Sequence, residues 1–166
     1  MKTPPIPVAA LALALPAVLA LPGPVLAEPY LGRCHMDECL HYDQVSRSVI
    51  GTGGAAVPGD LVLVALRSAV SDRADADPAT LAWEAPAPVQ VFCARDRPAY
   101  RLADGGYQGL DLVTPAGATT LVTAIYLHAC HPGAEISDDP FAAARALGYK
   151  ATPMVVHADL DALTRR

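Results

Sequence analysis

Short apolar segments bounded by turn residues occupy the middle of the chain. The segment Leu61–Leu66 is apolar and partly β-branched, and Pro58-Gly59-Asp60 directly before it is a turn signal. Val89–Cys93 opens with an alternation of apolar and polar residues, which is the period of a strand with one buried face. We therefore predict two strands here, the second of which carries Cys93 into the core.

A hairpin is expected in the segment that follows. Tyr100–Tyr107 contains Asp104-Gly105, and Asp-Gly supplies the positive φ angles that a type I′ hairpin turn requires. Gly109–Val113 is then the expected return strand. These elements predict a small, mainly antiparallel sheet.

The C-terminal part of the chain carries helix signals. Asp139 is suited to cap a helix, Pro140 to occupy its first position, and Gly148 to end it. Met154–Val156 is predicted to be a last short strand and Asp159–Arg166 a terminal helix. The chain is thus predicted to have an α+β fold, a mainly antiparallel sheet with one or two C-terminal helices.

Other segments are ambiguous. Thr119–Cys130 is rich in β-branched residues, which favours a strand, whereas the spacing of its apolar positions also fits one face of a helix. Of the two we predict a strand. Leu81–Trp83 is expected to be an edge strand. Cys34–Cys39 is expected to form one helical turn or a tight loop, and Asp43–Ile50 a short strand or a turn.

The first 27 residues have the pattern of a secretory signal peptide. After Lys2, the stretch Ile6–Ala27 holds no charged side chain, and it ends in Val25-Leu26-Ala27 before Glu28. Small or modest side chains before the cleavage point and a charge after it match the preference of signal peptidase. We expect cleavage after Ala27, so that residues 28–166 form a single exported domain.

Two alternatives remain open for this leading segment. One is cleavage after Ala20. The other is an uncleaved membrane anchor, for which the apolar span is long enough. Proline breaks a helix when it lies in the interior, so the anchor is the less favoured reading. Three prolines interrupt the span: Pro16, Pro22 and Pro24.

Charge and composition argue against several kinds of partner for residues 28–166. Of the 12 basic residues only Lys2 lies before this range, so 11 basic residues stand against 17 acidic ones, a formal charge of −6. The absence of a basic run argues against nucleic acid, and the negative charge argues against adsorption to anionic lipid. We expect no membrane association after cleavage. Lys150 is the only lysine here, against ten arginines, which is typical of a GC-rich bacterial genome. The expected location is the periplasm or the medium.

All four cysteines lie after the leading segment. An even number of cysteines in an exported chain predicts two structural disulfides. Sequence proximity favours Cys34 with Cys39 and Cys93 with Cys130, and the other two pairings stay open. Neither spacing is the Cys-x-x-Cys of a thiol redox site. The cysteines are therefore expected to staple the domain, and no cofactor is expected.

Histidines near the cysteines give a second hypothesis, a periplasmic metal-binding protein. Imidazole and thioether groups are plausible copper ligands outside the cytoplasm. Four imidazoles would converge if Cys34 and Cys130 were close in space, although the spacing matches no known zinc or copper pattern. The candidate ligands are His35, His41, His128 and His131.

Signals for catalysis are weak. The sequence has no Gly-x-Ser-x-Gly and no His-Glu-x-x-His motif. Some carboxylates could pair across space as in glycosidases, but they are expected to be surface or turn residues. These are Asp37, Glu38, Asp104 and Asp111. An unrecognised hydrolase is therefore the third hypothesis. The leading one is a non-catalytic exported module that binds a partner in the cell envelope, with another protein as the favoured partner. Inhibitor or immunity proteins and envelope accessory factors are analogous to it in size and number of cysteines.

Overall fold

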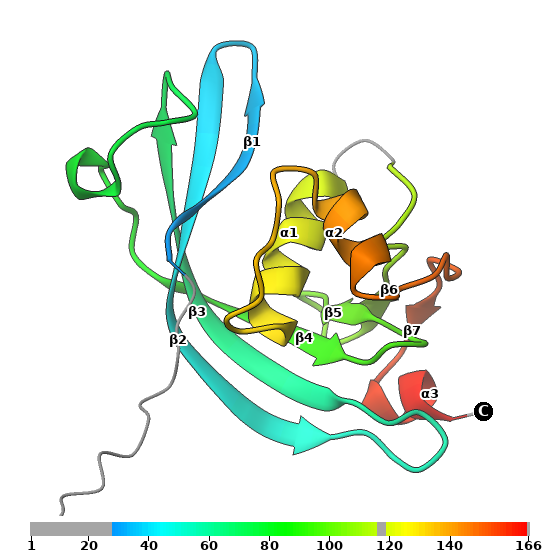
Figure 1. Ribbon diagram of the computed structural model, residues 1–166. Coiled ribbons are helices and arrows are strands. Elements are labelled where there is room, and N and C mark those ends of the chain that lie inside the picture. Colours follow the sequence, from blue (N-terminus) through cyan, green and yellow to red (C-terminus); the bar gives the residue numbers. More distant parts are fainter. Residues whose placement is uncertain (1–27, 116–118, 166) are drawn as a thin grey trace, which may run out of the picture.

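Among the described residues, seven strands form one antiparallel sheet, and their order in the sheet follows their order in the chain (Figure 1). The computed structural model describes residues 28–115 and 119–165, so the proposed signal peptide 1–27 lies outside the described residues. β2 and β3 are 15 and 12 residues long and pair over almost their whole length. The strands are β1 (Tyr30–His35), β2 (Glu38–Thr52), β3 (Asp60–Ser71), β4 (Ala87–Cys93), β5 (Ala99–Arg101), β6 (Tyr107–Gly109) and β7 (Val156–His157).

Three α-helices lie in the C-terminal half of the described chain. The carboxylate of Asp139 accepts hydrogen bonds from the backbone N–H groups of Phe141 and Ala142, both at 3.0 Å, and Gly148 has a φ of 83°. This helix therefore begins and ends as predicted. The helices are α1 (Thr119–Cys130), α2 (Pro140–Ala146) and α3 (Leu160–Thr164), and a short 3-10 helix spans Pro78–Thr80. The α+β class with a mainly antiparallel sheet is confirmed.

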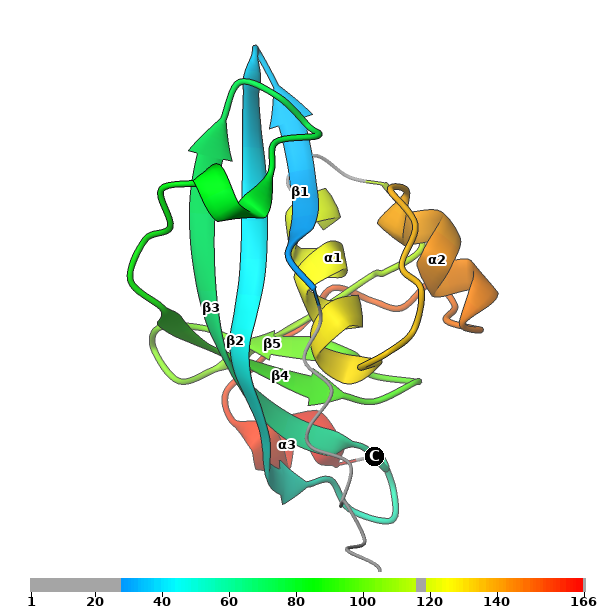
Figure 2. The same ribbon diagram turned by 60° about the vertical axis from the view of Figure 1, so that its left-hand side comes forward.

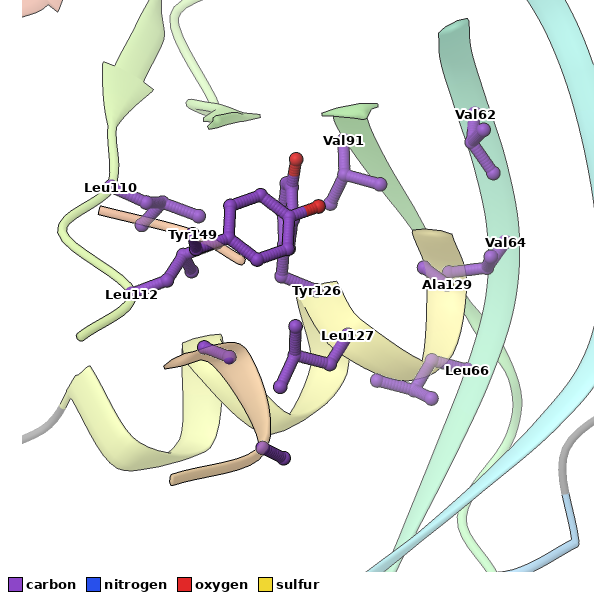
Figure 3. Close-up of a cluster of buried hydrophobic side chains, with 12 residues drawn as sticks. Val62, Val64, Leu66, Val91, Leu110, Leu112, Tyr126, Leu127, Ala129 and Tyr149 are labelled. Carbon is purple, nitrogen blue, oxygen red and sulfur yellow. The ribbon is translucent and has the colours of Figure 1, made fainter. Parts of the chain in front are cut away.

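The inner face of the sheet holds the main core. Side chains alternate along a strand, so Val62, Val64 and Leu66 of β3 share one face. They belong to one buried cluster with Tyr126 and Leu127 of α1 (Figure 3). α1 lies in the hollow of the bent sheet, and α2 packs against the side of α1 that faces away from the sheet (Figure 2).

The outer face of the sheet is covered at two separate places. At the place where α3 covers the sheet, Leu61 of β3 packs in a second buried cluster with Leu163 of α3. Towards the other end, Arg67 of β3 lies under Trp83, with the guanidinium carbon 4.9 Å from the ring centroid. Trp83 belongs to the segment 72–86, which is bonded to β3 there by the Glu84 N–H donating to the Ser68 carbonyl at 2.8 Å. The middle of the outer face stays open between these two covered parts.

Thr119–Cys130 is a helix, so the predicted strand is wrong. α1 is packed against the sheet on one side and α2 on the other, so apolar residues extend around most of its circumference. The helical periodicity is weak for that reason. Tertiary packing also outweighs the modest helix penalty of the β-branched residues that favoured a strand.

Two smaller predictions are also wrong. Leu81–Trp83 forms no strand, and the indole N–H of Trp83 instead donates to the Pro78 carbonyl at 3.0 Å. The hairpin after β5 exists, but its return strand is β6, Tyr107–Gly109. Its turn is not type I′, because Gly105 is the only residue there with positive φ.

Candidate functional site

The far end of the sheet projects beyond the helices. Residues 33–41 of β1 and β2 and residues 69–75 at the end of β3 form this end, which we call the finger. Figures 1 and 2 both show it extending past α1. Each residue from Cys39 to Gln44 pairs with one from Ser71 to Leu66, so the length of β2 and β3 carries the finger away from the main core.

A two-residue turn forms the tip of the finger. His35 and Glu38 are the last paired residues, and Met36 and Asp37 between them have φ angles of 50° and 61°. Two positive φ angles at the central positions define a type I′ turn, for which Asn-Gly is the preferred sequence. The left-handed conformation costs roughly 1–2 kcal/mol for an ordinary residue. Met36 nevertheless occupies it with 84% of its surface exposed. Folding alone does not explain methionine at this position.

A disulfide closes the finger directly behind the tip. Cys34 and Cys39 are opposite each other in the β1–β2 register, with a Cα–Cα distance of 4.0 Å. Cys39 is buried and Cys34 is exposed. The pairing is the predicted one, and of the two predicted local forms the tight loop is found, as the turn of a β-hairpin that the disulfide ties at its base. The cross-link restricts the relative motion of the two strands next to the turn.

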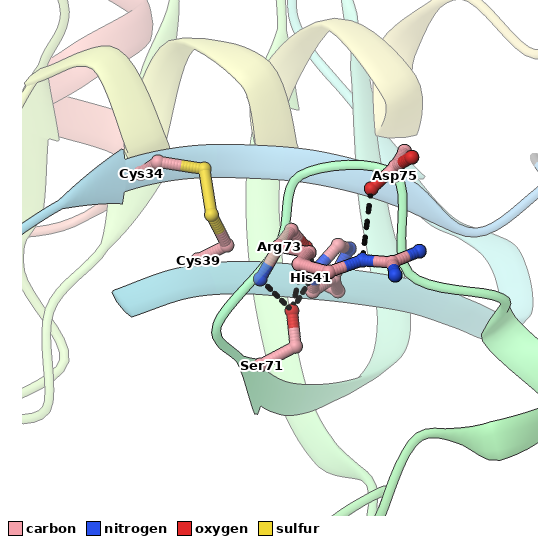
Figure 4. Close-up of a disulfide and its surroundings, with 6 residues drawn as sticks. All are labelled: Cys34, Cys39, His41, Ser71, Arg73 and Asp75. Atoms are coloured by element: carbon pink, nitrogen blue, oxygen red, sulfur yellow. Dashed lines mark hydrogen bonds and ion pairs between the residues drawn. A yellow bond between two sulfur atoms is a disulfide. The ribbon is translucent and has the colours of Figure 1, made fainter. Parts of the chain in front are cut away.

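A buried histidine braces the finger from the side of β3. His41 is 5% exposed, and its Nε2 lies 2.8 Å from the hydroxyl of Ser71 (Figure 4). The Ser71 hydroxyl donates to the Arg73 carbonyl at 2.7 Å, so the imidazole N–H donates to Ser71 Oγ. The Arg73 guanidinium in turn pairs with Asp75 at 3.1 Å. These contacts hold the segment after β3 against β2, so three chain segments support the tip.

The surface of the finger combines apolar and acidic groups. Met36 and Val70 are 84% and 58% exposed. Asp37, Glu38 and Asp72 are exposed as well, and none of the three forms an ion pair with another described residue. Arg33 of β1 is exposed on the finger too, so the surface is mixed with an excess of carboxylates. An apolar tip on such a surface is suited to contact a basic protein surface that has an apolar pocket.

The four candidate metal ligands are held in separate surroundings. His35 is exposed beside the tip, and His41 is bonded to Ser71. The ring of His128 on α1 stacks on Tyr30 with a centroid distance of 3.6 Å, and burial lowers the pKa of His128 to about 4. The described residues include no group of three or more His, Cys, Asp or Glu side chains placed to hold a metal ion. The convergence of imidazoles that the metal hypothesis required is therefore not found among them.

His131 follows α1 and belongs to a cluster with aromatic residues. Its Nε2 lies 2.8 Å from the hydroxyl of Tyr149, and the Arg95 guanidinium lies 5.7 Å from the Tyr149 ring centroid. Burial, and then the charge of Arg95, lower the pKa of His131. These contacts favour the neutral form of the imidazole and hold it against Tyr149.

The carboxylates of the hydrolase hypothesis are also dispersed. Asp37 and Glu38 lie at the finger. Asp104 accepts from the Gly106 N–H at 3.0 Å within its own turn, and Asp111 accepts from the N–H groups two and three residues further on. Such local bonds are those of turn-forming aspartates. They agree with the prediction of surface and turn positions.

The second disulfide lies in the body of the protein. Cys93 at the end of β4 is bonded to Cys130 at the end of α1, with a Cα–Cα distance of 5.4 Å. The predicted pairing is confirmed, but it joins the sheet to the helix layer and not two strands. The two disulfides are compatible with an extracellular or periplasmic location.

The comparisons add no relative. Searches against protein-family models, curated proteins and solved structures found no match to this chain. Of the helices in the described part of the chain, none has the length and apolar character needed to cross a membrane.

Proposed function

We propose that this chain is a non-catalytic exported module that uses the finger to bind a partner protein in the cell envelope. The observation that carries the proposal is Met36, an apolar side chain held almost fully exposed in a left-handed conformation. Unfavourable backbone conformations persist where the surrounding structure fixes them, and they are concentrated at functional sites. The inhibitor or immunity type is the finer form of this proposal, and the signal-peptide pattern supports export.

The braces of the finger support the same proposal. Binding is weakened by the entropy of ordering flexible groups, so a contact residue on a rigid support binds more tightly. The disulfide Cys34–Cys39 and the buried contact between His41 and Ser71 both lie within a few residues of the tip. They stiffen an element that adds little to the main core, because none of the finger's side chains belongs to it.

Site-specific cross-linking tests the proposal. A photoreactive amino acid is placed at position 36 of the full chain, produced in the native exporting cell, and compared with the same group at Val155. Val155 is 50% exposed and lies at the opposite end of the sheet, so it is a matched control. We expect one discrete cross-linked protein from position 36 that is absent from position 155. Equal products from both positions, or none from position 36, would overturn the proposal.

Affinity measurements with the captured protein give a second readout. Met36→Asp is expected to weaken binding about tenfold or more, because a central apolar contact is replaced by a charge that must be desolvated. Val155→Asp is expected to leave the affinity unchanged. If both variants bind like the wild type, the finger is not the contact surface.

A further inference from the structure

The open middle of the outer sheet face is a groove of about 700 Å³. Leu63 of β3 forms its floor, between Leu61, which the C-terminal cluster buries, and Arg67, which Trp83 covers. Ile50 lies at an irregularity in the β2–β3 register and remains 48% exposed. Pro88 of β4 is the third apolar residue that lines the groove. Ligand sites of small molecules have volumes of about 300–1,000 Å³, so the groove is large enough for one.

A chain of hydrogen bonds across three strands holds a positive charge in this groove. Arg101 Nη1 donates to Gln90 Oε1 at 2.9 Å, and Gln90 Nε2 donates to the Tyr107 hydroxyl at 3.0 Å. Tyr107 itself is 4% exposed, so the far end of the chain is fixed in the second buried cluster. Arg101 is exposed, and its bond to Gln90 orients the guanidinium along the groove.

Arg101 forms no ion pair with another residue in the described part of the chain. The three ion pairs found there involve other arginines, and the nearest acidic residue in sequence, Asp104, accepts from a backbone N–H of its own turn. Four of the five guanidinium N–H groups of Arg101 remain for another acceptor. An arginine without an ion-pair partner beside an apolar floor is complementary to a molecule with one anionic end and one apolar end.

We propose that this groove binds a small amphipathic anion, with its carboxylate, sulfonate or phosphate head group on Arg101 and its hydrocarbon part over Leu63, Ile50 and Pro88. The head group gains charge-assisted hydrogen bonds, and the hydrocarbon part covers apolar surface that now faces water. The site is separate from the finger, so it is independent of the protein partner proposed above.

Calorimetric titration of the folded protein tests this proposal with three probes of equal chain length: decanoate, decyltrimethylammonium and 1-decanol. We expect saturable single-site binding of decanoate that is about tenfold tighter than that of the alcohol, because only the anion gains the bonds to Arg101. The cation is expected to bind most weakly. Equal binding of the anion and the cation would overturn the proposal, and so would the absence of decanoate binding.

Two matched variants separate the groove from a general charge effect. Arg101→Met removes the charge and keeps an apolar side chain, and we expect it to weaken decanoate binding about tenfold. Arg33→Met removes the same charge from an exposed position on β1 and is expected to leave binding unchanged. Equal losses in the two variants would show that only net charge matters. Circular dichroism and melting curves establish that both variants are folded.

Mapping of the bound probe gives the third readout. Amide resonances of Leu63, Gln90 and Arg101 are expected to shift on addition of decanoate. Shifts confined to Met154 and Val155, which are exposed apolar residues at the other edge of the sheet, would place the probe elsewhere and overturn the assignment.

Discussion

Histidines on and beside α1 are partly buried against tyrosine rings, and desolvation by this burial is the main cause that lowers the pKa values of these imidazoles. For His128 the pKa falls from 6.5 to about 4, and desolvation by burial is the cause. The folded protein therefore keeps this ring neutral at pH values where the unfolded chain binds a proton. The stability contributed by the neutral ring is complete above about pH 6.5 and is lost as the pH falls towards 4.

His128→Phe is expected to make the protein less sensitive to acid. The phenyl ring keeps the stack on Tyr30 and has no proton to bind. Each unit of pKa shift corresponds to about 1.4 kcal/mol, and the partial exposure of the ring reduces the total. Between pH 7 and pH 4.5 we therefore expect the free energy of unfolding to fall by about 1–2 kcal/mol more in the wild type than in the variant. Urea denaturation at the two pH values measures this. The exposed His35→Gln variant should behave like the wild type, and an equal fall in all three proteins would contradict the assignment.

The hydroxyl of Tyr126 satisfies backbone groups in the middle of the protein. It accepts from the Ala94 N–H at 3.1 Å and lies equally close to the carbonyl oxygens of Phe92 and Ala94, to one of which it donates. Tyr126 is fully buried, so no water replaces the hydroxyl if it is removed. Tyr126→Phe is expected to cost about 1–3 kcal/mol of unfolding free energy. Tyr100→Phe is the control, because Tyr100 makes none of these contacts, and denaturation curves that shift equally for both variants would refute the role of the hydroxyl.

At the scale of elements, the sequence predicts those whose signals are local. The turn before β3 and the caps of α2 depend on a few neighbouring residues, namely Pro58-Gly59-Asp60, Asp139-Pro140 and Gly148. Their chemistry acts within one turn of the chain. The caps of α2 are found as predicted, and β3 begins at Asp60, but the bend before it lies at residues 55–57. α1 has no such signal, because its conformation is decided by the sheet and helix that enclose it.

The finger could not be predicted either, because its local sequence lacks a turn signal and its contacts join distant parts of the chain. Its tip lacks the Asn-Gly or Asp-Gly signal of a two-residue hairpin, and Met36-Asp37 gives no hint of positive φ angles. The bracing contact joins His41 to Ser71, which are 30 residues apart and are brought together only by the long β2–β3 pairing. The open groove depends likewise on where distant segments cover the sheet.

Replacing Met36-Asp37 by Asn-Gly separates stability from binding in the finger. Asn and Gly adopt positive φ at lower cost, so the double variant is expected to raise the unfolding free energy by about 1 kcal/mol. If Met36 is kept for binding, the same variant loses affinity for the cross-linked partner. Thermal denaturation and binding are measured on the same preparation. A more stable variant with unchanged affinity would show that methionine at the tip is not a contact residue.

At the scale of the whole molecule, the two disulfides act on different parts of the fold. Cys34–Cys39 spans a sequence separation of 5 and lies within the finger, whose strands are already paired. Cys93–Cys130 spans a sequence separation of 37 and links β4 to α1. It therefore joins the sheet to the helix layer that covers the inner face of the sheet. Sequence proximity alone gave the correct pairing, whereas the layers that the longer bridge connects were visible only in the structure.

Removal of the longer bridge is therefore expected to destabilise the protein more than removal of the shorter one. A disulfide stabilises a protein mainly by restricting the unfolded chain, and the loop estimate is about 4 kcal/mol for the longer loop against about 2 kcal/mol for the shorter. Cys93→Ala with Cys130→Ala should lower the melting temperature by about 10 °C or more, the shift that about 3 kcal/mol produces in a domain of this size. Cys34→Ala with Cys39→Ala should lower it less and should act chiefly on the partner affinity, because the finger loses its cross-link while the inner core keeps its own. Calorimetry of both double variants under non-reducing conditions gives the comparison, and peptide mapping of the wild type verifies the pairing. If the short bridge cost as much stability as the long one, the finger would be a structural part of the core and not a projecting element stiffened for binding.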